Sequence, residues 1–298
     1  MNHLDFKLLH VHHNARAITL RFVDAQRQGV KVHIEEHIAV VVPAHNEASL
    51  LGRMLAGIPP WVQSIVVVDD GSTDDTAAVF DAWQQIDSRG VLLQHSKRMG
   101  VGAAIRSGYL WCRERKVDAA VVMAGDGQMA PSDLPALLDP ILRNEADYAK
   151  GNRFAHPECA KRMPLLRYSG TWALTWMTRF ISGYWHIFDS QSGFTVISRR
   201  CLETLPLEEI YSGYGVPNDI LVTLSLYDMR VADVPIVPLY GVGECSKMRI
   251  SRVSLTLSAL LIRLGLKRLK HLCSRAIKTK GQKHQLEVGP AFQDSTSN

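Results

Sequence analysis

Apolar runs that alternate with segments of helical spacing most constrain the fold of this chain. The run IAVVVPA, residues 38–44, is followed by EASLLGRMLAGI, whose leucines and methionine recur at helical spacing. A second run, SIVVVDD at 64–70, is stopped by acids and glycine and leads into a helix predicted at about 75–87. Strands that alternate with helices are typical of a mostly parallel sheet covered on both faces, so the sequence predicts an α/β fold.

The pattern continues beyond the second predicted helix. A third strand is expected at 90–94 and a fourth in DAAVVMAG, which ends just before Asp126. The second half of the chain is richer in turn residues and contains two plausible strands, FTVIS and RVADVPI. We expect these less regular pieces to belong to the same domain.

Polar and acidic residues follow three of the predicted strands. Because the carboxyl ends of parallel strands meet at one edge of a sheet, where ligands bind, these residues should lie close together. Oxygen ligands suit a divalent cation, and acceptor oxygens suit the N–H groups of a nucleotide base, so the pattern favours a nucleotide and its cation. Capping of the next helix is the alternative role for each acid. The residues are Asn46, Glu47, Asp69, Asp70, Asp126 and Gln128.

Composition excludes several classes of protein. The 298 residues are 46% hydrophobic, which supports a large core, and the formal charge of +5 suggests anionic partners without indicating nucleic acid. Five cysteines without C-x-x-C spacing argue against a disulfide framework or a zinc site and favour a reducing compartment. No run reaches the length of a spanning helix, so we expect a cytoplasmic protein.

The chain divides into four predicted segments. Residues 1–35 form an extension without an assigned role, and 36–250 form the nucleotide-binding domain. Residues 251–278 are predicted to form a basic amphipathic helix, and 279–298 a disordered polar tail. The basic helix predicts peripheral attachment to an anionic membrane surface, and the alternative is a helix packed on the domain.

Three other features are assigned ordinary structural roles. The histidines in HVHH at 10–13 lack partner acids or cysteines at ligand spacing, so surface histidines are favoured over a metal site. Gly100 and Gly102 do not complete a dinucleotide-binding pattern, and no P-loop pattern occurs. The tryptophans, at 172, 176 and 185, are expected to pack in the core or against lipid rather than to bind a sugar.

Several motifs in order resemble glycosyltransferase family 2, nearest to its dolichol-phosphate mannosyltransferase-like branch. They are VVVPAHNEASL, VVVDDGSTDDT, RMGVGAAIRSG and AGDGQMAPSDL, and the resemblance runs from about residue 37 to 250. It implies the GT-A fold, a nucleotide-binding α/β/α sandwich with a mostly parallel sheet. It also implies inverting sugar transfer from a nucleoside-diphosphate sugar.

The resemblance assigns donor-binding residues by position. The first loop would contact the nucleotide, Asp70 would contact the base, and the basic residues would lie over the diphosphate and stabilise the leaving group. Without the resemblance, the basic residues near 247 would be interpreted as a solvated loop. The donor-binding set is Pro43, Ala44, Asn46, Glu47, Asp70, Gly100, Arg153, Lys247 and Arg249.

A cation, Mg²⁺ or Mn²⁺, is implied at Asp126, which resembles the last acid of the family's D-x-D motif and is counted as catalytic. Gln128 would be a second ligand. Ala124 stands where the first acid usually lies, so the resemblance implies fewer protein ligands and more water and phosphate around the cation.

Acceptor-side residues are expected in DSQSGF and PND, namely Asp189, Gln191, Ser192 and Asp219. Asp219 is a candidate catalytic base if the acceptor is a sugar hydroxyl, whose proton must be removed. A lipid phosphate is already an anion and needs only positioning. Helix capping or loop anchoring is the alternative role for Asp219.

The sequence therefore predicts a glycosyltransferase that moves a sugar to an acceptor, with a polyprenyl phosphate favoured, at the cytoplasmic face of a membrane. A nucleotidyltransferase is the first alternative, but the glycine-rich, arginine-containing loop of such enzymes is missing after VVVPAH. A catalytically inactive nucleotide-sugar-binding protein is the second, and Ala124 is the residue that favours it.

Overall fold

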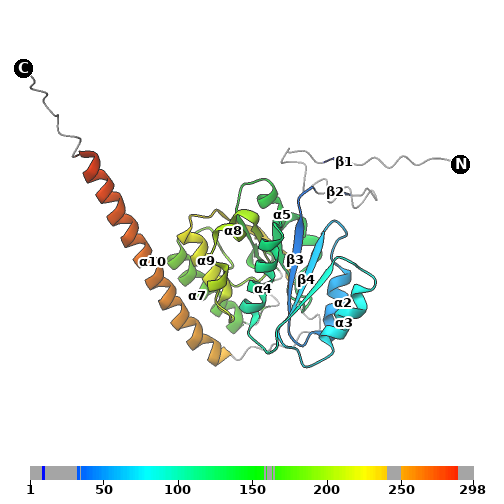
Figure 1. Ribbon diagram of the computed structural model, residues 1–298. Helices are drawn as coiled ribbons and strands as arrows, with labels where there is room; N and C mark the ends of the chain where they lie inside the picture. Colours follow the sequence, from blue (N-terminus) through cyan, green and yellow to red (C-terminus); the bar gives the residue numbers. More distant parts are fainter. Residues whose placement is uncertain are drawn as a thin grey trace, which may run out of the picture.

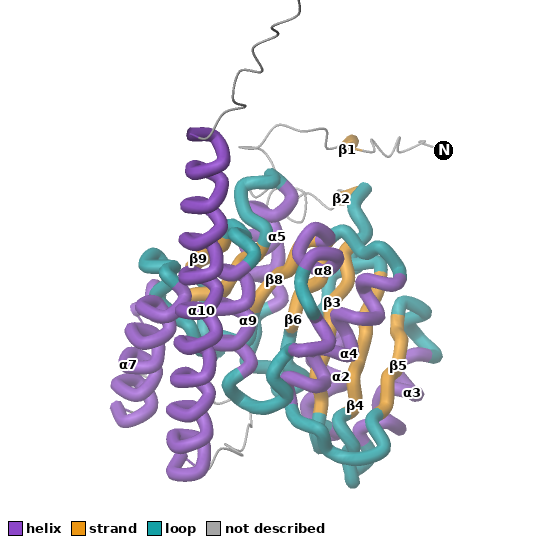
Figure 2. The backbone as a smooth tube through the Cα atoms, turned by 60° about the vertical axis from the view of Figure 1, so that its left-hand side comes forward, coloured by secondary structure: helices purple, strands orange, loops and turns teal. Residues whose placement is uncertain are grey.

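A seven-stranded sheet forms the centre of the computed structural model, which describes residues 9–10, 32–33, 35–157, 159, 163, 165–239 and 250–287. The strand order is β5-β4-β3-β6-β8-β7-β9, and only β8 runs antiparallel to its neighbours. Figure 2 shows these strands side by side. The strands are β3 (Ile38–Ala44), β4 (Ser64–Asp69), β5 (Gly90–Gln94), β6 (Ala119–Val122), β7 (Tyr148–Asn152), β8 (Thr195–Ser198) and β9 (Val231–Pro235), with a separate pair β1 (Leu9–His10) and β2 (Val32–His33).

Helices cover both faces of the sheet. Ile38, Val40 and Val42 of β3 contribute to a core shared with α2, α3 and α5, and the alternate residues Ala39 and Val41 contribute to a core shared with α4, α8 and α9. Figure 1 shows α4 on one side of β3 and β4, with α2 and α3 on the other. The α/β/α sandwich predicted from the apolar runs is thus confirmed. The helices are α2 (Ala48–Ala56), α3 (Thr76–Gln84), α4 (Val101–Glu114), α5 (Leu134–Leu142), α7 (Leu165–Ser182), α8 (Arg199–Thr204), α9 (Val216–Leu226) and α10 (Ile250–Glu287), with short 3₁₀ turns η1 (Pro131–Asp133), η2 (Arg153–Ala155) and η3 (Leu207–Glu209).

Strand β7 is the strand of the seven-stranded sheet that the sequence did not reveal. Its sequence, YAKGN, contains a lysine, a glycine and an asparagine, so it lacks the apolar pattern of a buried strand. All five residues are nevertheless buried, between β8 and β9. This strand ends at the turn that begins with Arg153, so it places one of the predicted donor-binding residues.

Helix α10 packs on the domain through its leucines. Leu257, Leu260, Leu261 and Leu264 are buried, and Leu260 and Leu264 share a cluster with Val222 of α9. Packing on the domain was the alternative to membrane attachment that the sequence left open for this helix, and these leucines are packed on the domain. The helix also continues through Glu287, beyond the boundary predicted at residue 278, and extends away from the domain (Figure 1). Among the described helices, none is long and apolar enough to cross a membrane.

Close packing of α4 on the sheet depends on a glycine. A Cβ atom added at Gly108 would overlap the side chain of Val41 in β3, whereas one added at Gly265 of α10 would meet nothing within 4 Å. We expect Gly108→Ala to lower the free energy of unfolding by about 1–3 kcal/mol, because an overpacked core must shift. Gly265→Ala should raise it by about 0.5–1 kcal/mol through helix propensity. Urea denaturation of both variants checks the prediction, and equal effects of the two would contradict it.

Candidate active site

Three adjacent strands bring the predicted polar clusters to one edge of the sheet. The strand β3 lies between β4 and β6, and its last residue, Ala44, is opposite Asp69 in the parallel register. Backbone hydrogen bonds extend the pairing past the strands, since Asp70 N–H donates to the Ala44 carbonyl at 2.8 Å and Gly125 N–H donates to the Pro43 carbonyl at 3.2 Å. The loops that follow all three strands therefore start side by side.

The loop after β3 is held against the loop after β4. Asn46 has a positive φ of 55°, and its Oδ1 accepts a hydrogen bond from Thr73 N–H at 2.8 Å. The backbone N–H of Asn46 donates to Ser72 Oγ, and that of Glu47 donates to Thr76 Oγ1, both at 2.9 Å. These hydrogen bonds hold the backbone of the predicted nucleotide-binding loop against the segment that follows β4.

Glu47 lies beside the turn that carries Asp126. A Cβ atom added at Gly125 would be 3.5 Å from Glu47 Cγ, so the two loops lie close together. Within the turn, Gly127 has a φ of 71°, and Asp126 Oδ1 accepts a hydrogen bond from Gln128 N–H at 3.0 Å. Both Asp126 and Gln128 are half-buried, so a carboxylate and an amide stand at the carboxyl end of β6.

Asp70 is buried, and both of its carboxylate oxygens accept hydrogen bonds. Oδ1 accepts from Met99 N–H at 2.7 Å and lies 2.8 Å from His95 Nδ1, and Oδ2 accepts from Gly100 N–H at 2.8 Å. Burial favours a raised pKa, but the hydrogen bonds from His95 and the two backbone N–H groups outweigh it and hold the pKa of Asp70 below its ordinary value. The carboxylate thus fixes the loop before α4. Its contact with a base stays a prediction.

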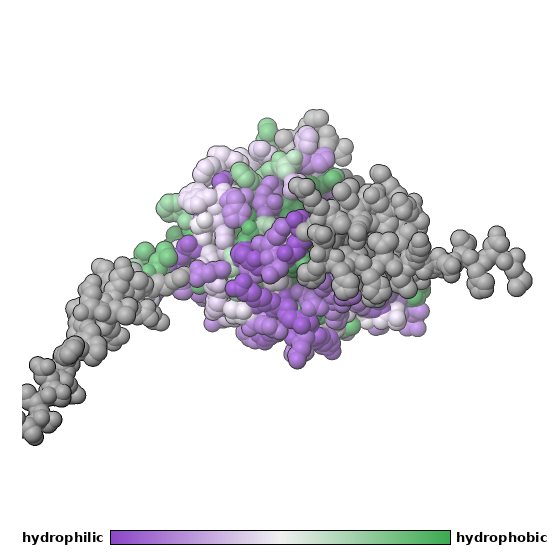
Figure 3. Space-filling model, turned by 90° about the horizontal axis from the view of Figure 1, so that it is seen from above, coloured by the Kyte–Doolittle hydropathy of each residue, from purple (hydrophilic) through white to green (hydrophobic). Residues whose placement is uncertain are grey.

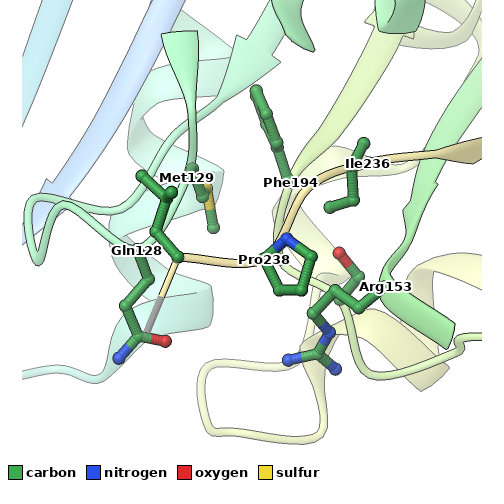
Figure 4. Close-up of a pocket in the computed structure, with 9 residues that line it drawn as sticks. Gln128, Met129, Arg153, Phe194, Ile236 and Pro238 are labelled. Carbon is green, nitrogen blue, oxygen red and sulfur yellow. The ribbon is translucent and has the colours of Figure 1, made fainter. Parts of the chain in front are cut away.

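A pocket opens between Gln128 and Arg153. Its lining also includes Met129, Ser192 and Ile236, among others. In Figure 4 the Gln128 amide and the Arg153 guanidinium stand on either side of Pro238 at the same end of the pocket. The predicted second cation ligand and a predicted diphosphate contact therefore line a common space, although they are 25 positions apart in the sequence.

Arg153 is positioned by a buried ion pair with Asp189. Its Nε and Nη2 donate to the two Asp189 oxygens at 2.7 and 3.0 Å, and its backbone N–H donates to Oδ2 at 3.2 Å. Burial acts to raise the pKa of Asp189, but Arg153 and Lys150 outweigh it and hold the pKa below the ordinary value. Asp189 was predicted on the acceptor side, and its described contacts make it the anchor of Arg153.

Lys150 is fully buried beneath the same loop. Its Nζ donates to the Ser192 carbonyl at 2.5 Å. Burial lowers its pKa to about 8, and the nearby Asp189 opposes that shift. Because Ser192 lines the pocket, the lysine supports the pocket wall from inside the sheet.

Gln191 points away from this wall into a buried polar cluster. Its Nε2 donates to Ser190 Oγ at 2.8 Å and to Asn218 Oδ1 at 2.6 Å. Of the predicted acceptor-side residues Asp189, Gln191 and Ser192, Ser192 is the one that lines the pocket.

Asp219 anchors a loop. It is 7% exposed, and its Oδ2 accepts a hydrogen bond from Tyr211 N–H at 2.9 Å. Burial raises its pKa, although that hydrogen bond and the cations Lys267 and Arg263 act in the opposite direction. The anchored loop contacts the start of α4, because Gly102 N–H donates to the Ser212 carbonyl at 2.8 Å. Loop anchoring was the alternative role for Asp219, and its role as a base stays a prediction.

Two predicted donor-binding residues, Lys247 and Arg249, lie outside the described residues. Elsewhere, in the described part of the chain, no group of three or more His, Cys, Asp or Glu side chains could hold a metal ion. Asp126 and Gln128 would bind a cation through oxygen atoms. This suits a hard cation for which water and phosphate supply most of the ligands.

Comparison with known proteins identifies the family. The sequence model of glycosyl transferase family 2 matches residues 39–205, which is more than half of the chain and includes the strand ends described above. The chain belongs to glycosyl transferase family 2. The family predicted from the four motifs is therefore confirmed.

Relatives in this family carry names of lipid-phosphate sugar transferases. The chain is 27% identical to a UDP-N-acetylglucosamine–dolichyl-phosphate N-acetylglucosaminyltransferase of Methanococcus voltae, over 68% of this chain and 86% of the relative. It is 31% identical to a polyprenol monophosphomannose synthase of Mycolicibacterium smegmatis, over 66% of this chain and 75% of the relative.

A solved structure shares the fold. Glucosyl-3-phosphoglycerate synthase of Mycobacterium tuberculosis, in complex with Mn²⁺, UDP and glucosyl-3-phosphoglycerate, superimposes with a TM-score of 0.59 at 21% identity. The match covers 78% of this chain and 80% of that chain. The likeness establishes the GT-A fold of this family 2 member.

Three residues of the site escaped the sequence prediction. Lys150, Asn152 and Asp233 lie on β7 and β9, and Asn152 Nδ2 donates to Asp233 Oδ2 at 2.5 Å. A charged residue inside YAKGN was the available signal, because a lysine in a buried strand requires a partner.

The Arg153–Asp189 pair gives a pH-dependent prediction. We expect Asp189→Asn to lower the free energy of unfolding by about 3 kcal/mol near neutral pH, because it removes the buried charge that pairs with the half-buried Arg153. Since the folded pKa of Asp189 is depressed, the pair stabilises the protein above the unfolded pKa of about 3.9 and loses this effect as pH falls through the folded value. Urea midpoints measured from neutral to acid pH should therefore converge for wild type and variant.

The exposed Asp81 supplies a matched control for this measurement. Asp81→Asn should change stability by no more than about 0.5 kcal/mol at any pH. A difference between wild type and Asp189→Asn that stays constant into acid would contradict a stabilising role of the Asp189 charge.

Proposed function

We propose that this protein transfers a sugar, with inversion, from a nucleoside-diphosphate sugar to a polyprenyl phosphate. The observation that carries the proposal is the edge of the sheet at which Glu47, Asp70 and Asp126 follow three adjacent strands, beside a pocket that contains Arg153. The names of the relatives, which include dolichyl-phosphate and polyprenol-phosphate transferases, support the acceptor.

The donor lies across the loops after β3, β4 and β6 in this proposal. The loop of Pro43, Ala44, Asn46 and Glu47 contacts the nucleotide, with the base toward Asp70 and Gly100 and the diphosphate toward Asp126. Arg153 balances the negative charge that develops on the departing diphosphate. Lys247 and Arg249 are proposed for the same role.

The oxygen donors at the end of β6 fit Mg²⁺ or Mn²⁺. Asp126 and Gln128 would hold the ion, and the fold neighbour was solved with Mn²⁺ and UDP. When bound, the ion supplies positive charge that stabilises the leaving diphosphate. Ala124 leaves a single carboxylate at this turn, which is compatible with a cation ligated chiefly by phosphate and water.

A polyprenyl phosphate acceptor is compatible with the surroundings of Asp219. A phosphate oxygen attacks as an anion, so no side chain has to remove a proton in the transfer step. The buried Asp219 is thus proposed to hold the Tyr211 loop rather than to act as a base. Because such acceptors are membrane lipids, we place the protein peripherally at the cytoplasmic face of a membrane.

Removal of the Asp126 carboxylate should abolish transfer. We expect Asp126→Ala to lower the rate at least about 100-fold, since one electrostatic contact to developing charge contributes on that scale. The assay offers UDP- and GDP-sugars with Mg²⁺ or Mn²⁺ and a short-chain polyprenyl phosphate, and it follows the glycolipid and the released nucleoside diphosphate.

The exposed Asp81→Asn variant is the control and should retain wild-type activity. Unchanged transfer by Asp126→Ala would refute the role of this carboxylate. Release of pyrophosphate in place of a nucleoside diphosphate would indicate nucleotidyl transfer and overturn the proposal. Donor binding without turnover in the wild type would indicate the inactive binding protein.

A further inference from the structure

Five aromatic side chains form an exposed surface on α7 and the loop that follows it. Trp172, Trp176 and Phe180 recur at four-residue spacing on one side of the helix and are 54%, 43% and 74% exposed. Trp185 and Phe188 of the loop are 51% and 53% exposed. We call these five residues the aromatic face.

Ring contacts join neighbouring members of the aromatic face. The rings of Trp172 and Trp176 are 5.6 Å apart and those of Phe180 and Trp185 are 6.3 Å apart, both in edge-to-face arrangements. The Arg179 guanidinium lies over both Trp176 and Phe188, at 4.6 and 4.9 Å from the ring centres. A contiguous exposed patch of this kind marks an interaction site.

The opposite side of α7 is polar and faces the protein. Thr175 Oγ1 lies 3.1 Å from Ser190 Oγ, and Thr178 Oγ1 donates to Asn218 Oδ1 at 3.0 Å. A surface helix in water places its apolar side inward and its polar side outward. This helix does the reverse, so its outer side is suited to an apolar medium. The buried hydroxyl residues are Thr171, Thr175, Thr178 and Ser182.

Charge separates the two outer helices from the rest of the chain. The sequences of α7 and α10 together contain eleven Lys or Arg and one acid, Glu287, whereas the remaining residues contain 23 Lys or Arg and 28 Asp or Glu. The side chains of these helices that the structure describes include five cations and no acid, so they make a basic region on a domain that is otherwise acidic; the cations are Arg179, Arg263, Lys267, Arg268 and Lys270. Such a region is attracted to anionic lipid headgroups.

Helix α10 continues the apolar surface next to α7. Its Arg268 Nη2 would be 2.8 Å from a Cβ atom on Gly183, at the end of α7, and Figures 1 and 2 show the two helices side by side. Its exposed residues include four large aliphatic side chains beside cations such as Lys267 and Lys270. On the left side of the coloured surface in Figure 3, green hydrophobic residues lie beside purple hydrophilic ones. The exposed aliphatic residues are Ile262, Leu266, Leu269 and Leu272.

We propose that the aromatic face inserts into the headgroup region of an anionic lipid bilayer, with the cations of α10 beside it. Tryptophan favours the membrane–water interface, and Lys and Arg on an amphipathic surface bind anionic lipid. A second copy is disfavoured, because a symmetric contact would bring two basic regions together. This inference rests on the proposed function, because it identifies the surface that contacts the membrane in which a polyprenyl phosphate lies. It does not depend on which sugar is transferred.

The test compares the full chain with the variant Trp172→Ser/Trp176→Ser/Phe180→Ser in co-sedimentation with phosphatidylcholine vesicles that contain phosphatidylglycerol. We expect the variant to bind at least about tenfold more weakly, since three aromatic side chains no longer leave water. Quenching of tryptophan fluorescence by brominated lipid should be strong in the wild type and largely lost in the variant. Vesicles of phosphatidylcholine alone should bind the wild type more weakly, because they lack the anionic headgroup.

The control variant is Ile86→Ser, which removes an 87% exposed apolar side chain beyond α3, and it should bind like wild type. Equal binding by the triple variant and wild type would overturn the proposal, as would a dimer in lipid-free solution that the triple variant abolishes. Slow hydrolysis of the donor in detergent-free buffer should be unchanged in the triple variant. Loss of this hydrolysis together with a changed circular dichroism spectrum would show that the substitutions damage the domain. Absence of hydrolysis in the folded wild type would instead count against the proposed function.

Discussion

The backbone pairing of β3 with β4 and β6 is the constraint on which the site depends. These three strands are buried apolar segments, so their register is fixed by two cores that use alternate residues of β3. Once that register is set, the loops of Glu47, Asp70 and Asp126 must begin at the same edge. The polar contacts that follow, from Asn46 to Thr73 and from Asp70 to Gly100, refine loops whose positions are already determined by the sheet.

The sequence predicts the parts of this site that buried apolar strands position, and it does not predict the parts that depend on polar contacts between distant residues. The strands β3 to β6 are apolar runs, so their order along the chain and the polar residues at their ends were visible. The strand β7 was not, because Lys150 is satisfied by Ser192, 42 positions away, and Asn152 by Asp233, 81 positions away. Local pattern carries no signal of such partners. The same holds for Asp189, whose position was predicted but whose pairing with Arg153 required the fold.

The outer helices show a second limit of sequence patterns. The leucines of α10 suggested a membrane-binding side, but Leu257, Leu260 and Leu264 are buried against the domain. The tryptophans of α7 were expected to pack in the core or against lipid, and Trp172 and Trp176 are exposed. Periodicity identifies an apolar side of a helix. It does not reveal whether the protein itself already covers that side, which depends on the neighbouring elements.

The chain links the aromatic face to the pocket over a very short distance in sequence. Phe188 is 53% exposed on the aromatic face, and the next residue, Asp189, is fully buried in its ion pair with Arg153. Ser192, three residues further on, lines the pocket and is held by Lys150. A lipid phosphate lies at the level of the headgroups, where the aromatic face would insert. Docking through α7 would therefore bring the acceptor phosphate toward Arg153 without a separate lipid-binding domain, and the buried charges under this loop would keep its geometry fixed while the outer side contacts the bilayer.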